Sequence, residues 1–390
     1  MAPPVETAEQ NRTSLLRSLR RVTTSGRYIP EIDGLRFVAI LSVILYHVTV
    51  QLGIPAAGSY WLWYLISHGA RGVELFFLIS GFILGLPFAT HLLTAGRPVR
   101  LRDYFLRRVT RLEPPYILAI LIRIPLLILI MHKPLHFVLT HGLASLFYLH
   151  SLIFGAASAV NPPAWSLEVE IQFYCLAPIL AWSYFRLRPK SLRRLLGLTF
   201  ILLCGLLQVH YLSMPSYPRL SLSILNYAQY FFAGFWLCDL YLEDWDRIPS
   251  HWLWDLVSLP AWGWIFLAEG WKVHVFLPFA ILVVYLGAFK GYLFPSFFRT
   301  VWVSLIGGMC YSIYLTHNLA ITGAGYLLHR WLSSPTVSNG AKDILAYGAV
   351  IPLVLAVGLV LYILVERPCM DKNWPSKLRM RLRGQAVPLQ

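Results

Sequence analysis

Two ionisable residues, Arg36 and His47, lie within the first long apolar run of the sequence. Their spacing of eleven residues is within about 20° of three full helical turns, so a helix would place both side chains on one face, about 16 Å apart along its axis. Ionisable groups inside a membrane helix are costly and commonly functional. Because a neutral histidine can act as a general base, the pair predicts a cationic path that ends at a reactive imidazole. Arg36 as an interfacial side chain and His47 as an interhelical hydrogen-bond partner are the structural alternatives.

The composition indicates which elements would position this pair. The chain is 57% hydrophobic and 13% charged, with a mean hydropathy of +0.60, whereas soluble domains are about 25% charged. We therefore predict an all-α, polytopic membrane helical bundle with about ten transmembrane helices of about 20 residues each. The predicted spans are residues 33–52, 73–93, 114–131, 165–185, 195–212, 226–242, 252–268, 274–288, 301–327 and 344–365. The apolar segment 136–154 is predicted to be a half-buried outer loop.

The distribution of Lys and Arg gives this bundle a direction. With ten spans and both termini cytoplasmic, 25 of the 33 basic residues lie on the inner side and six on the outer side, as the positive-inside rule requires. The predicted domains are a basic cytoplasmic arm (1–30), the transmembrane domain (31–368) and a basic cytoplasmic tail (369–390). The net charge of +15 then reflects topology and attraction to anionic membrane lipids, so no nucleic-acid partner is expected.

Further polar residues lie in or beside the second and third predicted spans. Arg71 and Glu74 are three residues apart and could pair on one helix face, while Ser80 precedes Gly81, where small residues favour close helix packing. Arg108 and Arg111 are also three apart, on a predicted amphipathic helix before the third span. Their guanidinium groups could converge on a phosphate, although ordinary positive-inside charge explains them equally well.

The start of the fourth predicted span carries a polar cluster. Glu168 and Glu170 are two residues apart and therefore point to different sides of a helix, so one of them is expected to be the functional acid. Trp165, Ser166 and Tyr174 lie around it, in an arrangement that could bind hydroxyl groups or orient an imidazole. A carboxylate exposed to water at the interface is the structural alternative.

His317 lies within the ninth predicted span, in the segment CYSIYLTHNLAI. Its surroundings favour a buried, hydrogen-bonded histidine. Several other histidines fall in the outer segment around 132–150, but no third ligand accompanies them. We therefore predict no metal site.

Taken together, these motifs resemble the acyltransferase-3 family of integral membrane O-acyltransferases. The matching segments, in family order, are IDGLRFVAILSVILYH, GVELFFLISGFIL, FLRRVTRLEPPY, NPPAWSLEVEIQFY, YSIYLTHNLAI and the closing VERP. They extend from about residue 31 to residue 368. The resemblance implies transfer of an acyl group, commonly acetyl, from cytoplasmic acyl-CoA to a hydroxyl group of a carbohydrate or glycolipid acceptor at or beyond the outer face.

The resemblance also implies roles for individual residues. His47 looks like the catalytic histidine and Glu170 like the acid of the fourth-span motif, while Arg36, Arg108 and Arg111 would bind acyl-CoA. Acyl-CoA, with acetyl-CoA favoured, is then a co-substrate, and no tightly bound cofactor is expected. We expect the form of the family that has no fused hydrolase-like domain. The expected location is a bacterial inner membrane, and the oligomeric state stays open. A transporter that uses the intramembrane Arg, His and Glu as a relay is the alternative function.

Overall fold

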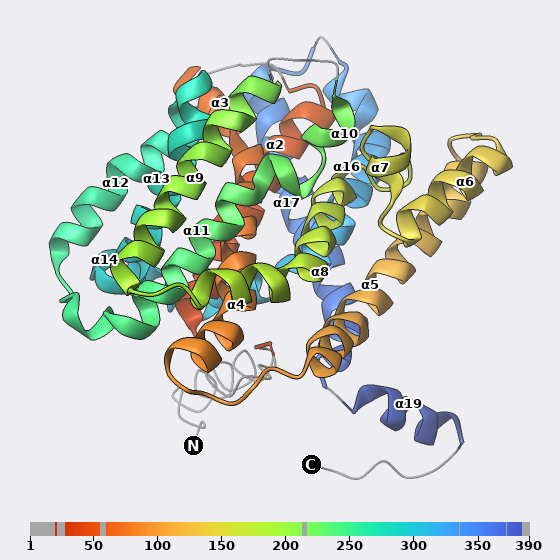
Figure 1. The fold of residues 1–390 in the computed structure, drawn as a ribbon. Helices are drawn as coiled ribbons and strands as arrows, with labels where there is room; N and C mark the ends of the chain where they lie inside the picture. The colour runs from red at the N-terminus through yellow and green to blue at the C-terminus, as the bar shows by residue number, and fades with distance from the viewer. Residues whose placement is uncertain are drawn as a thin grey trace, which may run out of the picture.

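The computed structural model describes residues 20–21, 28–54, 60–212, 217–334, 336–371 and 373–383. These residues form helices and no strand (Figure 1), which confirms the predicted all-α class. Most of the predicted arm 1–30 lies outside the described residues. The larger helices are α2 (Pro30–Gln51), α4 (Gly72–Leu93), α5 (Leu101–Leu129), α8 (Trp165–Phe185), α9 (Lys190–Leu212), α11 (Ile224–Glu243), α12 (Trp252–Leu267), α13 (Trp271–Lys290), α16 (Cys310–Leu332) and α17 (Asn339–Leu361). The shorter ones are α3 (Tyr60–Ser67), α6 (Leu135–Leu146), α7 (His150–Phe154), α10 (Pro218–Ser221), α14 (Leu293–Phe298), α15 (Val301–Gly308), α18 (Arg367–Cys369) and α19 (Trp374–Leu382).

Six helices in the described part of the chain are long and apolar enough to cross a membrane. They are Pro30–Gln51, Gly69–Leu93, Leu101–Leu129, Lys190–His210, Trp271–Lys290 and Asn339–Cys369. The protein is therefore built as an integral membrane bundle, and the total of about ten spans stays a prediction.

Helices α4 and α11 pack closely at the centre of the bundle. A Cβ atom at Gly81 would lie 2.2 Å from the backbone oxygen of Phe231, and one at Gly234 would lie 2.4 Å from the backbone nitrogen of Phe82. Only glycine allows this backbone approach. The predicted packing role of the Ser80–Gly81 pair is thus confirmed, and this contact fixes the face of α4 that carries Ser80.

Helix α5 corrects the prediction that Pro114 and Pro115 begin a span. The helix already starts at Leu101 and contains both prolines in its interior. Proline cannot donate a backbone hydrogen bond, so Pro114 leaves the carbonyl oxygen of Thr110 without its helical partner. Trp374 supplies the missing donor, with its Nε1 2.9 Å from that oxygen. The predicted amphipathic helix and the third span are therefore one rigid element.

Two other predicted segments also differ from the structure. The predicted loop 136–154 contains two helices, α6 and α7, because its apolar residues pack against α5 and α8. Helix α6 has 12 residues, about 18 Å in length, which is shorter than a hydrocarbon core of about 30 Å. The predicted span 301–327 breaks at Met309 into α15 and α16. At the end of α15, a Cβ atom on Gly307 would lie 1.7 Å from the backbone oxygen of Asp33, so α15 packs directly on the start of α2.

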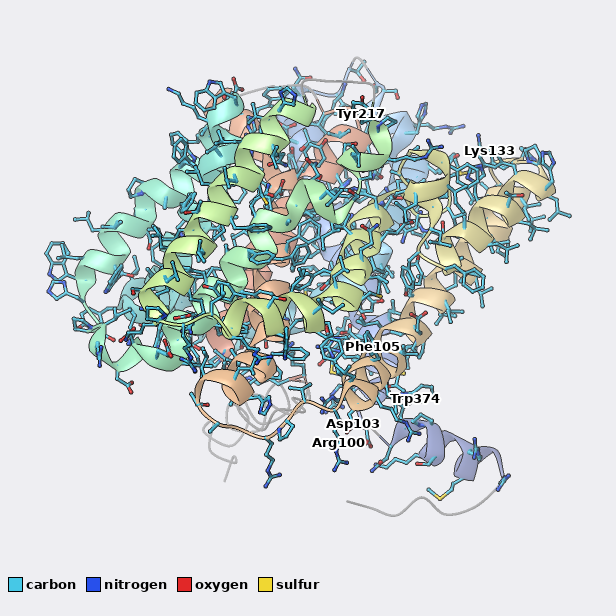
Figure 2. The ribbon with its side chains drawn as sticks, in the orientation of Figure 1. Arg100, Asp103, Phe105, Lys133, Tyr217 and Trp374 are labelled. Carbon is cyan, nitrogen blue, oxygen red and sulfur yellow. The ribbon has the colours of Figure 1, made fainter. Side chains whose placement is uncertain are left out.

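The two ends of the bundle are clearly separated. Figure 2 shows Arg100, Asp103 and Trp374 at one end and Lys133 and Tyr217 at the opposite end. These labelled residues from predicted cytoplasmic segments and from predicted outer loops therefore lie at opposite ends of the described structure.

Candidate active site

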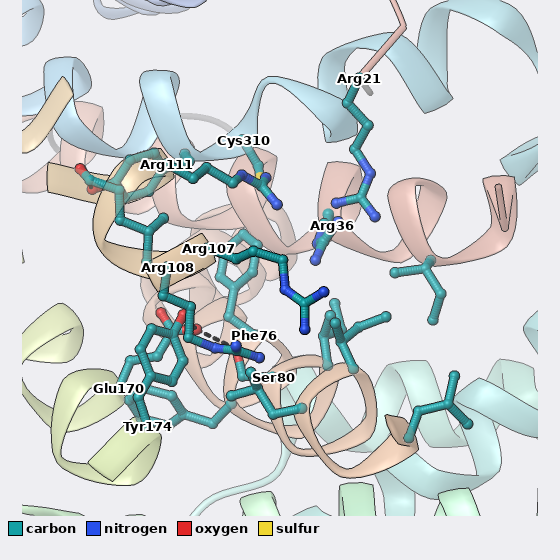
Figure 3. Close-up of a pocket in the computed structure, with 18 of the residues that line it drawn as sticks. Arg21, Arg36, Phe76, Ser80, Arg107, Arg108, Arg111, Glu170, Tyr174 and Cys310 are labelled. Carbon is teal, nitrogen blue, oxygen red and sulfur yellow. Dashed lines mark hydrogen bonds between the residues drawn. The ribbon is translucent and has the colours of Figure 1, made fainter. Parts of the chain in front are cut away.

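A pocket of about 660 Å³ lies among α2, α4, α5, α8 and α16 (Figure 3). Its wall is largely apolar, with polar side chains contributed by each of these five helices and by the segment before α2. These polar residues include Arg21, Arg36, Ser80, Arg107, Arg108, Arg111, Ser166, Glu170, Tyr174, Tyr311 and Tyr314. The structure thus brings together Arg36, the Arg108–Arg111 motif and Glu170, which the sequence places more than 130 residues apart.

The first two arginines share one carboxylate. Arg36 donates from Nη1 to Oδ1 of Asp33 at 2.9 Å, and Nε of Arg21 lies 3.4 Å from Oδ2 of the same aspartate. Asp33 is only 1% exposed. Burial and the neighbouring Arg36 lower the pKa of Arg21 to about 10, so it keeps its charge at neutral pH. Asp33 therefore orients both groups but balances only one of their charges.

Arg108 is held against aromatic rings. Its Nη1 donates to the backbone oxygen of Tyr104 at 2.6 Å, and its guanidinium carbon lies 3.6 Å from the centroid of the Tyr104 ring and 5.5 Å from that of Tyr174. Arg111 has a different partner, because its Nη2 lies 3.7 Å from Oε1 of Glu366. Stacking fixes the direction of Arg108 without neutralising it.

Glu366 connects Arg111 to α16. It belongs to the π-helical turn Tyr362–Glu366, and its Oε2 accepts hydrogen bonds from the backbone nitrogen of Ser312 at 3.1 Å and from its hydroxyl at 2.6 Å. Arg107 is exposed and has no ion-pair partner among the described residues. Within the described chain, the five arginines of the pocket are accompanied by three carboxylates, Asp33, Glu366 and Glu170, and only Arg21, Arg36 and Arg111 form ion pairs with them. The remaining positive charge suits a phosphate-bearing ligand.

Glu170 faces the pocket from α8. It accepts hydrogen bonds from the hydroxyl of Ser80 and from the hydroxyl of Tyr174 at 2.6 Å. Glu168 points elsewhere, since its Oε2 accepts a hydrogen bond from the backbone nitrogen of Ser151 at 2.8 Å. The prediction that these two carboxylates lie on different sides of the helix is confirmed. Ser166 also lines the pocket, 3.1 Å from the hydroxyl of Tyr314.

His47 lies just beyond the end of the pocket that Val43 lines. Arg36 and Val43 of α2 line the pocket, and His47, a described residue that is not part of the lining, continues the same helix face by one turn. Its ring centroid is 4.9 Å from that of His317 on α16. His317 is 0% exposed and donates from Nδ1 to the backbone oxygen of Tyr314 at 2.7 Å, which confirms the predicted buried, hydrogen-bonded histidine.

Arg123 contacts the residue that directly follows His317. Its Nη1 donates to the backbone oxygen of Val160 and its Nη2 to Oδ1 of Asn318, both at 2.9 Å. Asn318 directly follows His317. This arginine therefore ties α5 and the segment before α8 to the turn of α16 that carries the histidine.

Three residues that the sequence analysis considered, Arg71, Glu74 and Trp165, lie outside the pocket lining. Arg71 donates to the backbone oxygens of Ile265 and Ala268, both at 2.7 Å, and so binds the carboxyl end of α12. Arg71 and Glu74 interact electrostatically, but the predicted close ion pair is not formed among the described residues, because both Nη atoms of Arg71 bond to these backbone oxygens. The Trp165 ring packs 5.5 Å from the ring of Tyr227, outside the pocket lining.

Some residues of the site are missing from the sequence prediction. Tyr104 and Asp33 hold the pocket arginines, and each lies three or four residues before its partner, a spacing that places two side chains on one helix face. That spacing is a signal that sequence reasoning could use. The partnership of Arg111 with Glu366 joins residues 255 positions apart and has no local signal.

Comparison with known proteins gives a family match and partial relatives. A family model described as an acyltransferase domain matches residues 29–363. A Bacillus subtilis (strain 168) protein provisionally named peptidoglycan O-acetyltransferase YrhL is 31% identical over 207 residues, which are 50% of this chain and 30% of that protein. The O-acetyltransferase OatA of Staphylococcus aureus is 27% identical over 196 residues, which are 47% of this chain and 30% of that protein. The chain therefore spans about a third of the length of these relatives. No solved structure matches the chain.

Proposed function

Because the chain belongs to the acyltransferase-3 family, we propose that it is a multi-pass membrane O-acyltransferase. It transfers an acyl group, with acetyl favoured, from acyl-CoA to a hydroxyl group of a carbohydrate or glycolipid. The observation that carries this proposal is the cationic pocket that ends one helical turn before His47. The names of the relatives, both O-acetyltransferases, support the acetyl group and the hydroxyl acceptor.

The pocket suits acyl-CoA in both size and charge. Its volume of about 660 Å³ lies in the range of small-molecule sites. The phosphates of the CoA head group would rest among Arg107, Arg108 and Arg111, whose guanidinium groups can bind phosphate oxygens in a bidentate manner. The narrow arm that carries the thioester would then follow the α2 face past Arg36 toward His47, a distance of about 16 Å along the helix.

His47 would act on the thioester at the end of this path. It either removes the proton of the acceptor hydroxyl or takes the acyl group transiently before passing it on. Glu170, held by Ser80 and Tyr174, would bind or activate the acceptor. Glu170 lines the pocket and His47 lies one helical turn beyond it, and neither role requires a bound metal or a tightly bound cofactor.

The proposed setting is a bacterial cell membrane, with ten spans and both termini on the cytoplasmic side. Support comes from the six long apolar helices, from the separation of the predicted inner and outer loops in Figure 2, and from the bacterial relatives. With that orientation, the arginines face the cytoplasmic acyl-CoA pool and His47 lies beyond the middle of the bundle. The acyl group would thus move toward an acceptor at the outer face.

Transfer of label from [¹⁴C]acetyl-CoA in membranes that contain the chain tests this function. Replacing His47 by alanine should lower transfer at least about 100-fold, as expected for loss of a catalytic base or nucleophile. His329→Ala is the matched control, because His329 lies exposed near the end of α16. Undiminished transfer in the His47 variant would refute its catalytic role. Transport of a solute without release of free CoA would favour the transporter alternative.

A further inference from the structure

His47 and His317 form a histidine pair that joins α2 to α16. Their ring centroids are 4.9 Å apart and their planes are tilted by 60°. Each residue lies one turn beyond a residue that lines the pocket, Val43 on α2 and Tyr314 on α16. Two imidazole rings, those of His47 and His317, therefore lie just beyond this end of the pocket.

Hydrogen bonds to the backbone fix the tautomer of both rings. Nδ1 of His47 lies 2.9 Å from the backbone oxygen of Val43, and Nδ1 of His317 lies 2.7 Å from that of Tyr314. A carbonyl oxygen can only accept, so each Nδ1 must carry a proton, and each neutral ring then has its lone pair on Nε2. Both imidazoles thus present a free basic nitrogen.

The Nε2 atom of His317 is buried and has no hydrogen-bond partner among the described residues. Such an atom is costly to bury unless a donor reaches it. The backbone supplies none, and the nearby Arg123 directs both Nη atoms to Val160 and Asn318. No described group of the protein supplies this donor, and the hydroxyl group of a bound acceptor is a donor of the right kind.

We propose that His317 is the general base that takes the proton of the acceptor hydroxyl, while His47 meets the acyl donor. This inference rests on the proposed function and divides its chemistry between two residues. His47 continues the α2 face that leads from the arginines. His317 lies deeper and adjoins the segment before α8, which belongs to the predicted outer side.

The reaction balances with these two groups. The acceptor oxygen attacks the acyl carbonyl carbon and its proton moves to Nε2 of His317, so that a C–O bond forms and an O–H bond breaks. The bond from the acyl carbon to its carrier breaks in turn. This carrier is the CoA sulfur, or Nε2 of His47 where His47 has first displaced the thiolate. His317 finally returns its proton to the CoA thiolate, and both histidines end as they began.

The test uses the full chain in lipid nanodiscs, with acetyl-CoA as donor and two acceptors. One acceptor is an N-acetylglucosamine oligosaccharide, which offers only hydroxyl groups for O-acylation. The other is hydroxylamine, an amine nucleophile that attacks without prior loss of an O–H proton. The variant is His317→Gln, whose amide can still donate to the backbone oxygen of Tyr314 but is not a base. His329→Gln, the same substitution in the exposed last turn of α16, is the control.

His317→Gln should bind acetyl-CoA within about twofold of wild type and form acetohydroxamate at a similar rate, while transfer to the sugar falls at least about 100-fold. Equal loss with both acceptors would overturn the inference, because it would indicate a structural role. Retained transfer to the sugar would overturn it as well, and so would a wild-type protein that acylates hydroxylamine but no hydroxyl. A wild-type protein that releases no CoA with either acceptor would instead refute the proposed function itself.

Discussion

Among the three arginines of α5 that line the pocket, Arg108 should contribute most to acetyl-CoA binding. It is half-buried, and its guanidinium group is fixed by the carbonyl and the ring of Tyr104, so little conformational freedom is lost when a phosphate binds. Arg107 is exposed and unpaired among the described residues. Arg111 shares its charge with Glu366, 3.7 Å away. The expected order of contributions is therefore Arg108, then Arg111, then Arg107.

The surroundings of each side chain set the size of its contribution. A partly buried hydrogen bond to a charged group contributes about 1.5–3 kcal/mol, so Arg108→Ala should raise the dissociation constant of acetyl-CoA about 10- to 150-fold. An exposed ion pair contributes about 0.2–1 kcal/mol, so Arg107→Ala should raise it by no more than about fivefold. Arg111→Ala should fall between these values, because its removal also leaves Glu366 without its cation.

Isothermal titration of the full chain in nanodiscs with acetyl-CoA measures these constants. Arg102→Ala is the matched control, since Arg102 is exposed on the first turns of the same helix and lies outside the pocket lining. Arg108→Lys tests geometry, because lysine keeps the charge but loses the planar, stacked fork, and it should restore only part of the affinity. Equal weakening by Arg102→Ala and Arg108→Ala would mean that binding responds only to net charge, and the assigned pocket would be incorrect.

Two further substitutions test the acid and the packing of α4. Glu170→Gln should leave acetyl-CoA affinity unchanged but lower acyl transfer, measured at saturating acetyl-CoA, about 100-fold. The amide keeps an acceptor for the Ser80 hydroxyl but cannot exchange protons. A parallel loss of acetyl-CoA affinity would contradict the assigned role of Glu170. Gly81→Leu should overpack the contact with Phe231, at a cost of about 1–3 kcal/mol, and lower the unfolding temperature in detergent by several degrees. Gly323→Leu, at a position on α16 with open space around it, should leave that temperature unchanged.

The parts of the site that sequence reasoning predicted are those governed by local helix geometry. The shared face of Arg36 and His47 and the opposite faces of Glu168 and Glu170 follow from the helical repeat alone. The close approach at Gly81 follows from its lack of a side chain. In each case a few neighbouring residues contain the physical cause, so no knowledge of the remaining chain is needed.

The parts of the structure that differ from the sequence prediction depend on contacts between residues that are distant in the sequence. Proline inside α5 is tolerated because Trp374, 264 residues from Thr110, bonds the carbonyl that Pro114 leaves free. Arg71 prefers carbonyl oxygens of α12, 194 or more residues away, to its neighbour Glu74. A single sequence gives no sign of such contacts, so local rules misplace the helix start and the ion pair.

The break between α15 and α16 shows how one such difference bears on function. A continuous helix over 301–327 would bond its backbone N–H groups internally, whereas the observed break starts a new 23-residue helix at Cys310, which lines the pocket. A helix amino terminus favours anions. Glu366 takes up one of these N–H groups, that of Ser312, and also faces Arg111. The same carboxylate thus holds the start of α16 and an arginine side chain at one wall of the pocket, so the break gives Arg111 a fixed partner there.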